Sequence, residues 1–130
     1  MRRLIEAVLD ASAVLALLRN EPGAEIVSAL LPKSAICTVN LAEVISTLVN
    51  KGASAEDADM IVADVFAQRV SADEPLARRA GTLRGATMHL GLSLGDRFCL
   101  ALAEREGVAA VTADKTWDKL AGLVKVTLVR

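Results

Sequence analysis

Short apolar runs alternate with longer amphipathic segments along the whole chain, and this alternation restricts the possible folds more than any other feature. Runs of aliphatic and β-branched residues predict buried strands at residues 4–9, 35–39, 108–112 and 124–129, and a shorter strand at 69–71. Short, continuously apolar strands joined by helices are typical of βαβ units. We therefore expect an α/β fold in which helices flank both faces of a central parallel sheet.

Helical spacing of apolar residues fills the segments between these strands. Helices are predicted at residues 12–18, 24–31, 41–51, 75–88, 94–106 and 115–120, and a further helix capped by Ser54 has an apolar stripe that runs to Phe66. We expect Asn40 to cap helix 41–51 and Gly52 to end it. Helix 94–106 is apolar on most sides, which predicts that it is largely buried.

The size and composition of the chain fit one small domain. With 130 residues, a single domain over residues 1–130 is expected. Such a domain buries roughly 65–70% of its unfolded surface, so it needs no disulfide or structural metal to fold. Cys37 and Cys99 have no cysteine near them in sequence, and His89 is the only histidine. We therefore expect two buried thiols in a reducing compartment and no zinc site.

Charge patterning bears on location and partners. Glu6 and Asp10 interrupt the apolar stretch near the N-terminus, which argues against a secretory signal. The longest stretch without a charged residue, 85–95, is well short of the ~20 apolar residues that a membrane-spanning helix needs. We therefore expect a cytoplasmic protein with no membrane association. A net charge of −1 lacks the overall basic footprint that is usual for nucleic-acid binders.

Four carboxylates occupy equivalent places in the predicted fold. Asp10 closes the first strand, Asp114 lies just after strand 108–112, and Glu43 and Asp96 lie in the first turns of helices. Ligands of open α/β sheets bind beyond the carboxyl ends of the strands, so these acids are expected to converge there. Crowded carboxylates repel one another unless a cation neutralises them, and oxygen ligands suit Mg²⁺ or Mn²⁺.

Each acid also has a purely structural interpretation. Asp10 and Asp114 would cap the short helices that follow them. Glu43 and Asp96 each lie three residues after a good N-cap residue, which is the spacing of a capping box. The metal-site hypothesis therefore depends on the four acids occurring together rather than on any one of them.

Hydroxyl and acidic neighbours extend this candidate site. Ser12 and Thr112 lie two residues from Asp10 and Asp114, respectively, where each could orient a carboxylate or hold a water. A helix-start hydroxyl and an ordinary β-branched strand residue are the structural alternatives. Asp118 lies one helical turn beyond Asp114, so it is either an outer member of the site or a solvated surface acid.

Four segments in order resemble the motifs of the PIN-domain family. They are Val8-Leu9-Asp10-Ala11-Ser12-Ala13, Asn40-Leu41-Ala42-Glu43-Val44, Leu92-Ser93-Leu94-Gly95-Asp96-Arg97 followed by Ala101-Leu102-Ala103, and Val111-Thr112-Ala113-Asp114 followed by Trp117. Each motif is weak alone, but their order and spacing match over nearly the whole chain. The chain length is similar to that of the VapC-type toxins of bacterial toxin–antitoxin pairs.

The resemblance implies a PIN-like single domain and a specific chemistry. The protein would be a metal-dependent endoribonuclease that hydrolyses RNA phosphodiester bonds with a metal-activated water. Asp10, Glu43, Asp96 and Asp114 would be the catalytic residues that bind Mg²⁺ or Mn²⁺, with Thr112 supporting Asp114. The resemblance also implies a homodimer, an RNA substrate and a cognate antitoxin protein as partner.

The RNA backbone requires positive charge near such a site. Arg97 directly follows Asp96 and would either bind a phosphate of the substrate or offset the charge of the acids. Arg78, Arg79 and Arg84 fall on one predicted helix, where they would contact RNA or form a solvated face.

Other functions of an acid-lined α/β fold remain as alternatives. A catalytically silent PIN-fold module that binds RNA or protein is one of them. A phosphoacceptor signalling domain would need paired acids at the first strand and a later strand-end lysine, and neither is evident. A haloacid-dehalogenase-like phosphatase would need a second aspartate at the position of Ser12.

Overall fold

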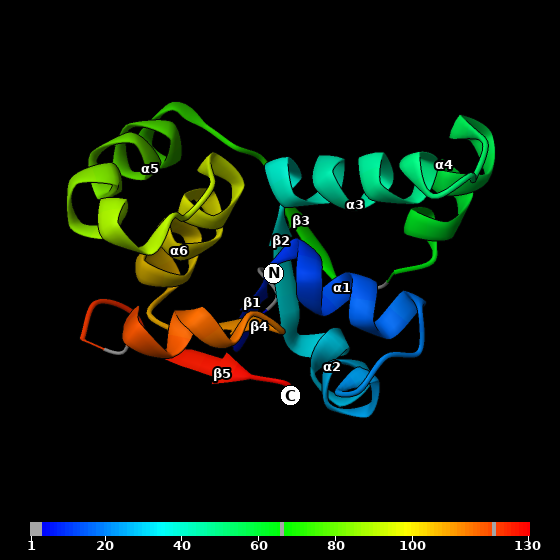
Figure 1. Cartoon of the computed structure of the whole chain (residues 1–130), viewed down its shortest axis with the longest axis horizontal. Helices are drawn as coiled ribbons and strands as arrows, with labels where there is room; N and C mark the ends of the chain where they lie inside the picture. Colours follow the sequence, from blue (N-terminus) through cyan, green and yellow to red (C-terminus); the bar gives the residue numbers. More distant parts are fainter. Residues whose placement is uncertain (1–3, 66, 121) are drawn as a thin grey trace.

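A five-stranded sheet forms the centre of the computed structural model, which describes residues 4–65, 67–120 and 122–130 (Figure 1). The strand order is β3-β2-β1-β4-β5, and every neighbouring pair is parallel. The strands are β1 (Ala7–Leu9), β2 (Ser34–Cys37), β3 (Gln68–Val70), β4 (Ala109–Thr112) and β5 (Val126–Leu128). The order runs outward from β1 in both directions, so the topological switch point lies between β1 and β4.

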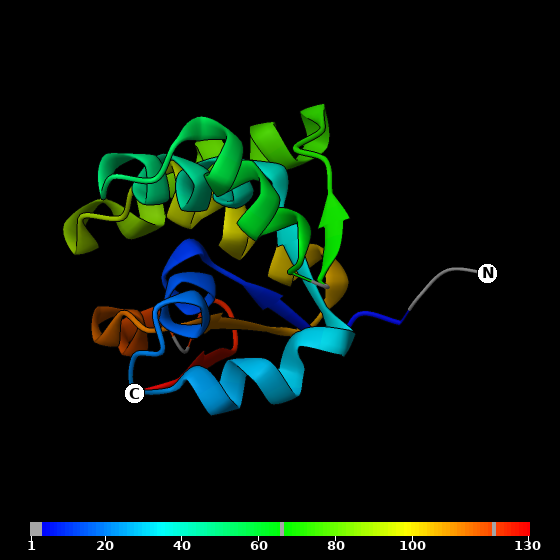
Figure 2. The same ribbon diagram turned by 90° about the vertical axis from the view of Figure 1, so that its right-hand side faces the viewer.

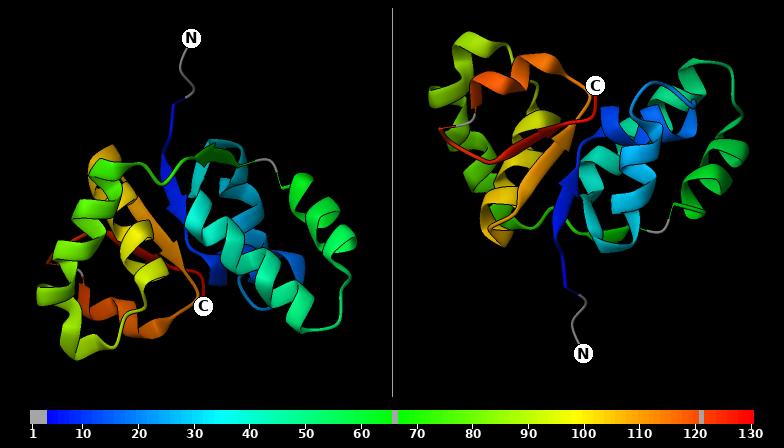
Figure 3. Two further views of the ribbon diagram at one scale, coloured as in Figure 1. Left: turned by 90° about the horizontal axis from the view of Figure 1, so that it is seen from above. Right: turned by 90° about the horizontal axis from the view of Figure 1, so that it is seen from below.

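Helices cover both faces of the sheet, as the sequence predicted. They are α1 (Ala11–Leu18), α2 (Ala24–Leu30), α3 (Thr38–Asn50), α4 (Ala55–Ala63), α5 (Glu74–Thr87) and α6 (Leu94–Glu106), with 3₁₀ turns η1 (Leu31–Lys33), η2 (Met88–Leu90) and η3 (Lys115–Leu120). Figure 3 shows α1 to α4 on one side of the strands and α5, α6 and η3 on the other. None of the helices in the described part of the chain is long and apolar enough to cross a bilayer.

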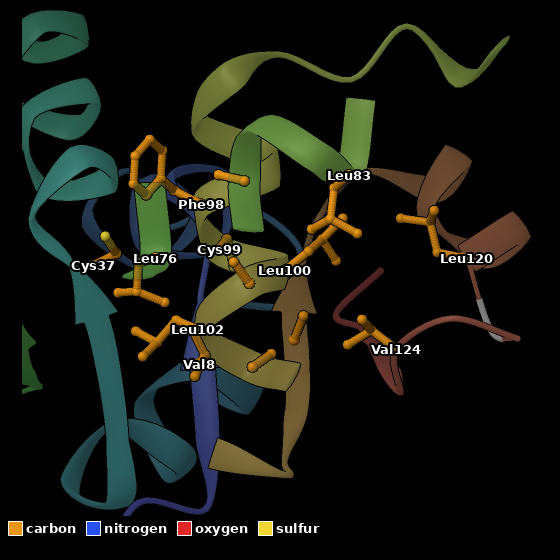
Figure 4. Packing of buried hydrophobic residues seen from close by; sticks show 14 of the residues in the cluster. Val8, Cys37, Leu76, Leu83, Phe98, Cys99, Leu100, Leu102, Leu120 and Val124 are labelled. Carbon is orange, nitrogen blue, oxygen red and sulfur yellow. The ribbon is translucent and has the colours of Figure 1, made fainter. Parts of the chain in front are cut away.

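Strand side chains alternate between two hydrophobic clusters, one on each face. Val8 and Ala110 pack with α5, α6 and η3, whereas Leu9 and Val111 pack with α1 to α4. Figure 4 shows the first cluster, in which the side chains of α6 lie between the strands and α5. Residues 97–103 of α6 are all buried, so the prediction of a largely buried helix is confirmed.

Local signals explain where several helices begin and end. Ser93 caps α6, and its hydroxyl and the Asp96 carboxylate form a complete capping box. Gly107 ends that helix with a left-handed backbone. Beyond β5, Val129 lies against the turn before α2, where Gly23 has φ of 98°, and Figure 2 shows the chain end beside that turn.

Most predicted boundaries differ from the structure by one to three residues, and residues 38 and 39, predicted at the end of the second strand, belong to α3. Two of these differences concern the neighbourhood of the acids. Strand β1 begins at Ala7 rather than residue 4, because its ladder starts opposite Ser34 and Ala109. Helix α3 begins at Thr38, so Asn40 lies within its first turn and is not the N-cap. The predicted end of the next apolar stripe, Phe66, lies outside the described residues.

Candidate metal and active site

Asp10 is the buried centre of the candidate site. It follows β1 directly and is 3% exposed. Its Oδ1 accepts hydrogen bonds from the Ala13 amide at 2.8 Å and the Ser12 hydroxyl at 2.8 Å. Its Oδ2 accepts from the Thr112 hydroxyl at 2.5 Å. Asp10 therefore caps α1, as the structural interpretation predicted, and is also fixed by a side chain from the neighbouring strand β4.

Two hydroxyls join Asp10 to the segment that carries Asp114. Besides its bond to Asp10, the Thr112 hydroxyl accepts from the Asp114 amide at 3.0 Å. The Ser12 hydroxyl accepts from the Ala113 amide at 2.9 Å. The end of β1 and the end of β4 are thus linked by hydrogen bonds at the switch point of the sheet.

Glu43 and Asp96 approach the same region from α3 and α6, two helices that pack together. Asn40 donates through Nδ2 to Glu43 Oε1 at 2.9 Å and to the Gly95 carbonyl at 3.0 Å. Asp96 accepts at Oδ2 from the Ser93 amide at 2.9 Å. Each carboxylate is therefore held through one oxygen by its local hydrogen bond.

The carboxylates influence one another electrostatically. Burial raises the pKa of Asp10 to about 6; hydrogen bonds from Thr112, Ala13 and Ser12 oppose this rise, and the charge of Asp96 adds to it. Burial also raises the pKa of Glu43, again with a contribution from Asp96. Proximity to Asp96 thus disfavours the ionised form of both neighbours.

The buried thiol of Cys99 lies within reach of the same charges. Burial raises the pKa of Cys99 well above its ordinary value, and the charges of Asp10, Asp96 and Glu43 all raise it further. Cys99 lies in α6, one turn after Asp96. Three of the four predicted acids therefore gather around the first turns of α6.

Asp114 and Asp118 lie at the exposed edge of this group. Asp114 accepts at Oδ1 from the Thr116 amide at 3.0 Å and the Thr116 hydroxyl at 2.7 Å, so it closes the turn that begins η3. Asp118 is exposed on η3. The expectation that it shares a face with Asp114 assumed an α-helix, and η3 is a 3₁₀ turn with a different angular spacing.

Arg97 occupies a different place from the one expected for a substrate-binding residue. It is 9% exposed, and its Nη1 donates to the Ala80 carbonyl of α5 at 2.9 Å. Its guanidinium therefore lies in the interface between α5 and α6. This placement argues against a phosphate contact without testing it. Within the described residues, none of the four acids forms an ion pair with Arg97 or with another cation.

The donor set suits a hard divalent cation. Glu43 Oε2, Asp96 Oδ1 and Asp114 Oδ2 accept no hydrogen bond from any described residue, so each of these three acids keeps one oxygen free. Both oxygens of Asp10 accept hydrogen bonds. Carboxylate oxygens are the ligands that Mg²⁺ and Mn²⁺ prefer. As the side chains stand, no three acidic, histidine or cysteine groups in the described ranges lie close enough to hold one ion. Side-chain rotation would be needed to complete the coordination.

Sequence reasoning missed the part that Gly95 plays in the site. A Cβ at this position would lie closer than 3.0 Å to both Glu43 carboxylate oxygens. An isolated glycine inside a helical pattern often has such a packing reason, so the signal was present. Asn40 was singled out only as a cap.

Comparison with known proteins agrees with the fold. A toxin–antitoxin complex from Klebsiella pneumoniae is 20% identical with a TM-score of 0.73, and the match covers 96% of this chain and 98% of that one. VapC20 of Mycobacterium tuberculosis, a toxin that cleaves the sarcin–ricin loop, is 19% identical with a TM-score of 0.76, and the match covers 93% and 98%. DNA-bound VapBC from Salmonella typhimurium is 16% identical with a TM-score of 0.75, covering 98% and 100%.

Sequence comparison assigns the family. No curated protein matches the chain at a significant level. The family model for the PIN domain matches residues 7–123, which include all four acids and every strand of the sheet except β5. The chain therefore belongs to the PIN domain family.

Proposed function

We propose that this protein is a metal-dependent endoribonuclease and the toxin of a toxin–antitoxin pair. One observation carries the proposal. Asp10, Glu43 and Asp96 lie near one another beyond the carboxyl ends of β1 and β4. Burial and, to a smaller extent, the charge of Asp96 raise the pKa of Asp10 and of Glu43, and no cation among the described residues forms an ion pair with any of the three. Uncompensated negative charge in a partly buried place destabilises the folded protein, and a bound divalent cation would reduce this repulsion.

Asp10, Glu43, Asp96 and Asp114 are the residues that would hold Mg²⁺ or Mn²⁺. When bound, the ion supplies an activated water and neutralises charge on the scissile phosphate. The chain contributes the orientation of its ligands. Thr112 and Ser12 hold the Asp10 carboxylate from two directions, and Asn40 holds that of Glu43.

The partners are proposed from the neighbouring structures. The similar chain from Klebsiella pneumoniae was solved in a toxin–antitoxin complex, and that from Mycobacterium tuberculosis is an RNA-cleaving toxin by its name. We extend to this protein an RNA substrate, a cognate antitoxin, a homodimeric state and a cytoplasmic location.

Cleavage of mixed cellular RNA by the purified protein, free of antitoxin, tests the activity. We expect cleavage that requires Mn²⁺ or Mg²⁺ and is abolished in Asp96→Asn. Asp59→Asn is the matched control, because Asp59 is an exposed acid on α4 and is not among the predicted site residues. Absence of cleavage with every metal, in protein shown to be folded, would favour the silent binding module instead.

A stability measurement accompanies the activity assay. Glu43→Gln and Asp96→Asn should keep or raise the melting temperature of the metal-free protein, because each removes one of the repelling charges. A fall in melting temperature that accompanies lost activity would mean that the variant had failed to fold, not that a ligand had been removed.

A further inference from the structure

Asn40 connects two helices through a single amide group. It is completely buried in the first turn of α3. Its Nδ2 donates one hydrogen to Glu43 Oε1 at 2.9 Å and the other to the Gly95 carbonyl at 3.0 Å. The amide therefore binds a carboxylate from its own helix and a backbone oxygen from α6 at the same time.

The orientation of this amide is determined by its neighbours. Both partners of Nδ2 are oxygen acceptors, so a flipped amide would place Oδ1 against two other oxygens. Asn40 Oδ1 is itself buried and has no hydrogen-bond partner. In this orientation the amide oxygen of Asn40 has no hydrogen bond, while both hydrogens on Nδ2 are donated, one to Glu43 and one to Gly95.

Gly95 supplies the space that the Glu43 carboxylate occupies. A Cβ at Gly95 would lie closer than 3.0 Å to Oε1, Oε2 and Cδ of Glu43. The backbone of α6 therefore rests directly on the carboxylate, one residue before Asp96.

We propose that Asn40 and Gly95 act together as positioning residues that place the Glu43 carboxylate for metal binding. This inference rests on the proposed function. The hydrogen bond from Asn40 holds the Glu43 carboxylate close to α6. The absence of a side chain at Gly95 leaves the space that this carboxylate occupies. Neither residue needs to touch the ion, and loss of either should release Glu43 from its position.

Binding of Mn²⁺ to the full chain, measured by calorimetry, tests the proposal without relying on activity. Asn40→Ala and Gly95→Ala should each weaken binding by roughly 10- to 100-fold, as is typical when the partner of a metal ligand is lost. Asn50→Ala is the control for the first, because Asn50 is exposed at the other end of α3. Gly85→Ala is the control for the second, because a Cβ on this α5 glycine meets nothing within 4 Å.

A crystal structure of metal-free Gly95→Ala provides a second readout. The Glu43 side chain can rotate, so we expect a folded protein with an unchanged or higher melting temperature and a displaced carboxylate. Wild-type affinity for Mn²⁺ in Gly95→Ala, with Glu43 in its original place, would overturn the proposal. Gly95→Ala also keeps the proposal open to refutation should Asn40→Ala fail to fold.

Failure of the proposed function has a different signature. In that case the wild type would not bind Mn²⁺, and Glu43→Gln would change nothing. The metal-free structure of Gly95→Ala would then decide the positioning role alone: a displaced Glu43 supports it, and an unmoved Glu43 overturns it.

Discussion

Acidifying the metal-free protein from pH 7 to pH 5 should stabilise it, because of Asp10. Burial raises the pKa of this carboxyl from its ordinary value of 3.8 to about 6 in the folded protein. The folded chain therefore binds a proton in this interval that the unfolded chain does not bind. This contribution to stability is fully present below about pH 4 and is lost as the pH rises through about 6.

The magnitude follows from the shift in pKa. A rise in the pKa of Asp10 from 3.8 to about 6 changes the free energy of unfolding by about 3 kcal/mol between low and high pH. Each pKa unit corresponds to about 1.4 kcal/mol. Between pH 7 and pH 5 only part of this range is crossed, so linkage gives about 1 kcal/mol. The pKa of Glu43 is raised as well, so it acts in the same direction.

Urea unfolding after removal of metal by a chelator measures this effect, with the fluorescence of Trp117, the only tryptophan, as the signal. The midpoint should be higher at pH 5 than at pH 7 in the wild type. Asp10→Asn should lose the Asp10 contribution, whereas Asp118→Asn should keep it. Lower wild-type stability at pH 5, or an undiminished pH dependence in Asp10→Asn, would refute the reasoning.

Three further substitutions test the packing and the role of Arg97. Trp117→Ala should cost about 3–5 kcal/mol in urea unfolding followed by circular dichroism, because this side chain is 0% exposed. Gly23→Ala should lower the melting temperature far more than Gly52→Ala: both have positive φ, but only at Gly23 would the Cβ collide with the backbone of Val129. Arg97→Met should leave the affinity for RNA unchanged in a filter-binding assay, because the guanidinium of Arg97 lies between α5 and α6. A large loss of affinity would instead support a contact between Arg97 and a phosphate of the RNA.

Local sequence signals predicted the elements that carry the acids. Ser93 and Asp96 form the capping box that their spacing suggested, and α6 has the predicted bounds. The apolar strands predicted that Asp10 and Thr112 lie at the same edge of a parallel sheet, and the pairing of β1 with β4 in the structure places them side by side. These features were predictable because the residues that decide them lie within one or two turns of the chain, or follow from the rules of parallel sheets.

Features decided by distant contacts were not predictable. Asn40 and Glu43 have the spacing of a capping box, but the amide is used instead to reach Gly95, which is 55 positions away. The side on which Arg97 would emerge could not be read from periodicity, because α6 is buried on nearly every side. The place of Asp118 depended on whether its segment forms an α-helix or a 3₁₀ turn.

The central position of β1 has a consequence for the order in which the chain is synthesised. Its neighbour β2 is synthesised soon afterwards, but its other neighbour, β4, is synthesised only after β2, β3 and the helices α1 to α6. Asp10 can therefore cap α1 early, yet its bond from Thr112 must wait for a residue 102 positions further along the chain. Pairing between such distant segments is also slow. A nascent chain that stops before β4 carries three of the acids without the hydroxyl of Thr112, so under the proposed function it does not yet have a complete site.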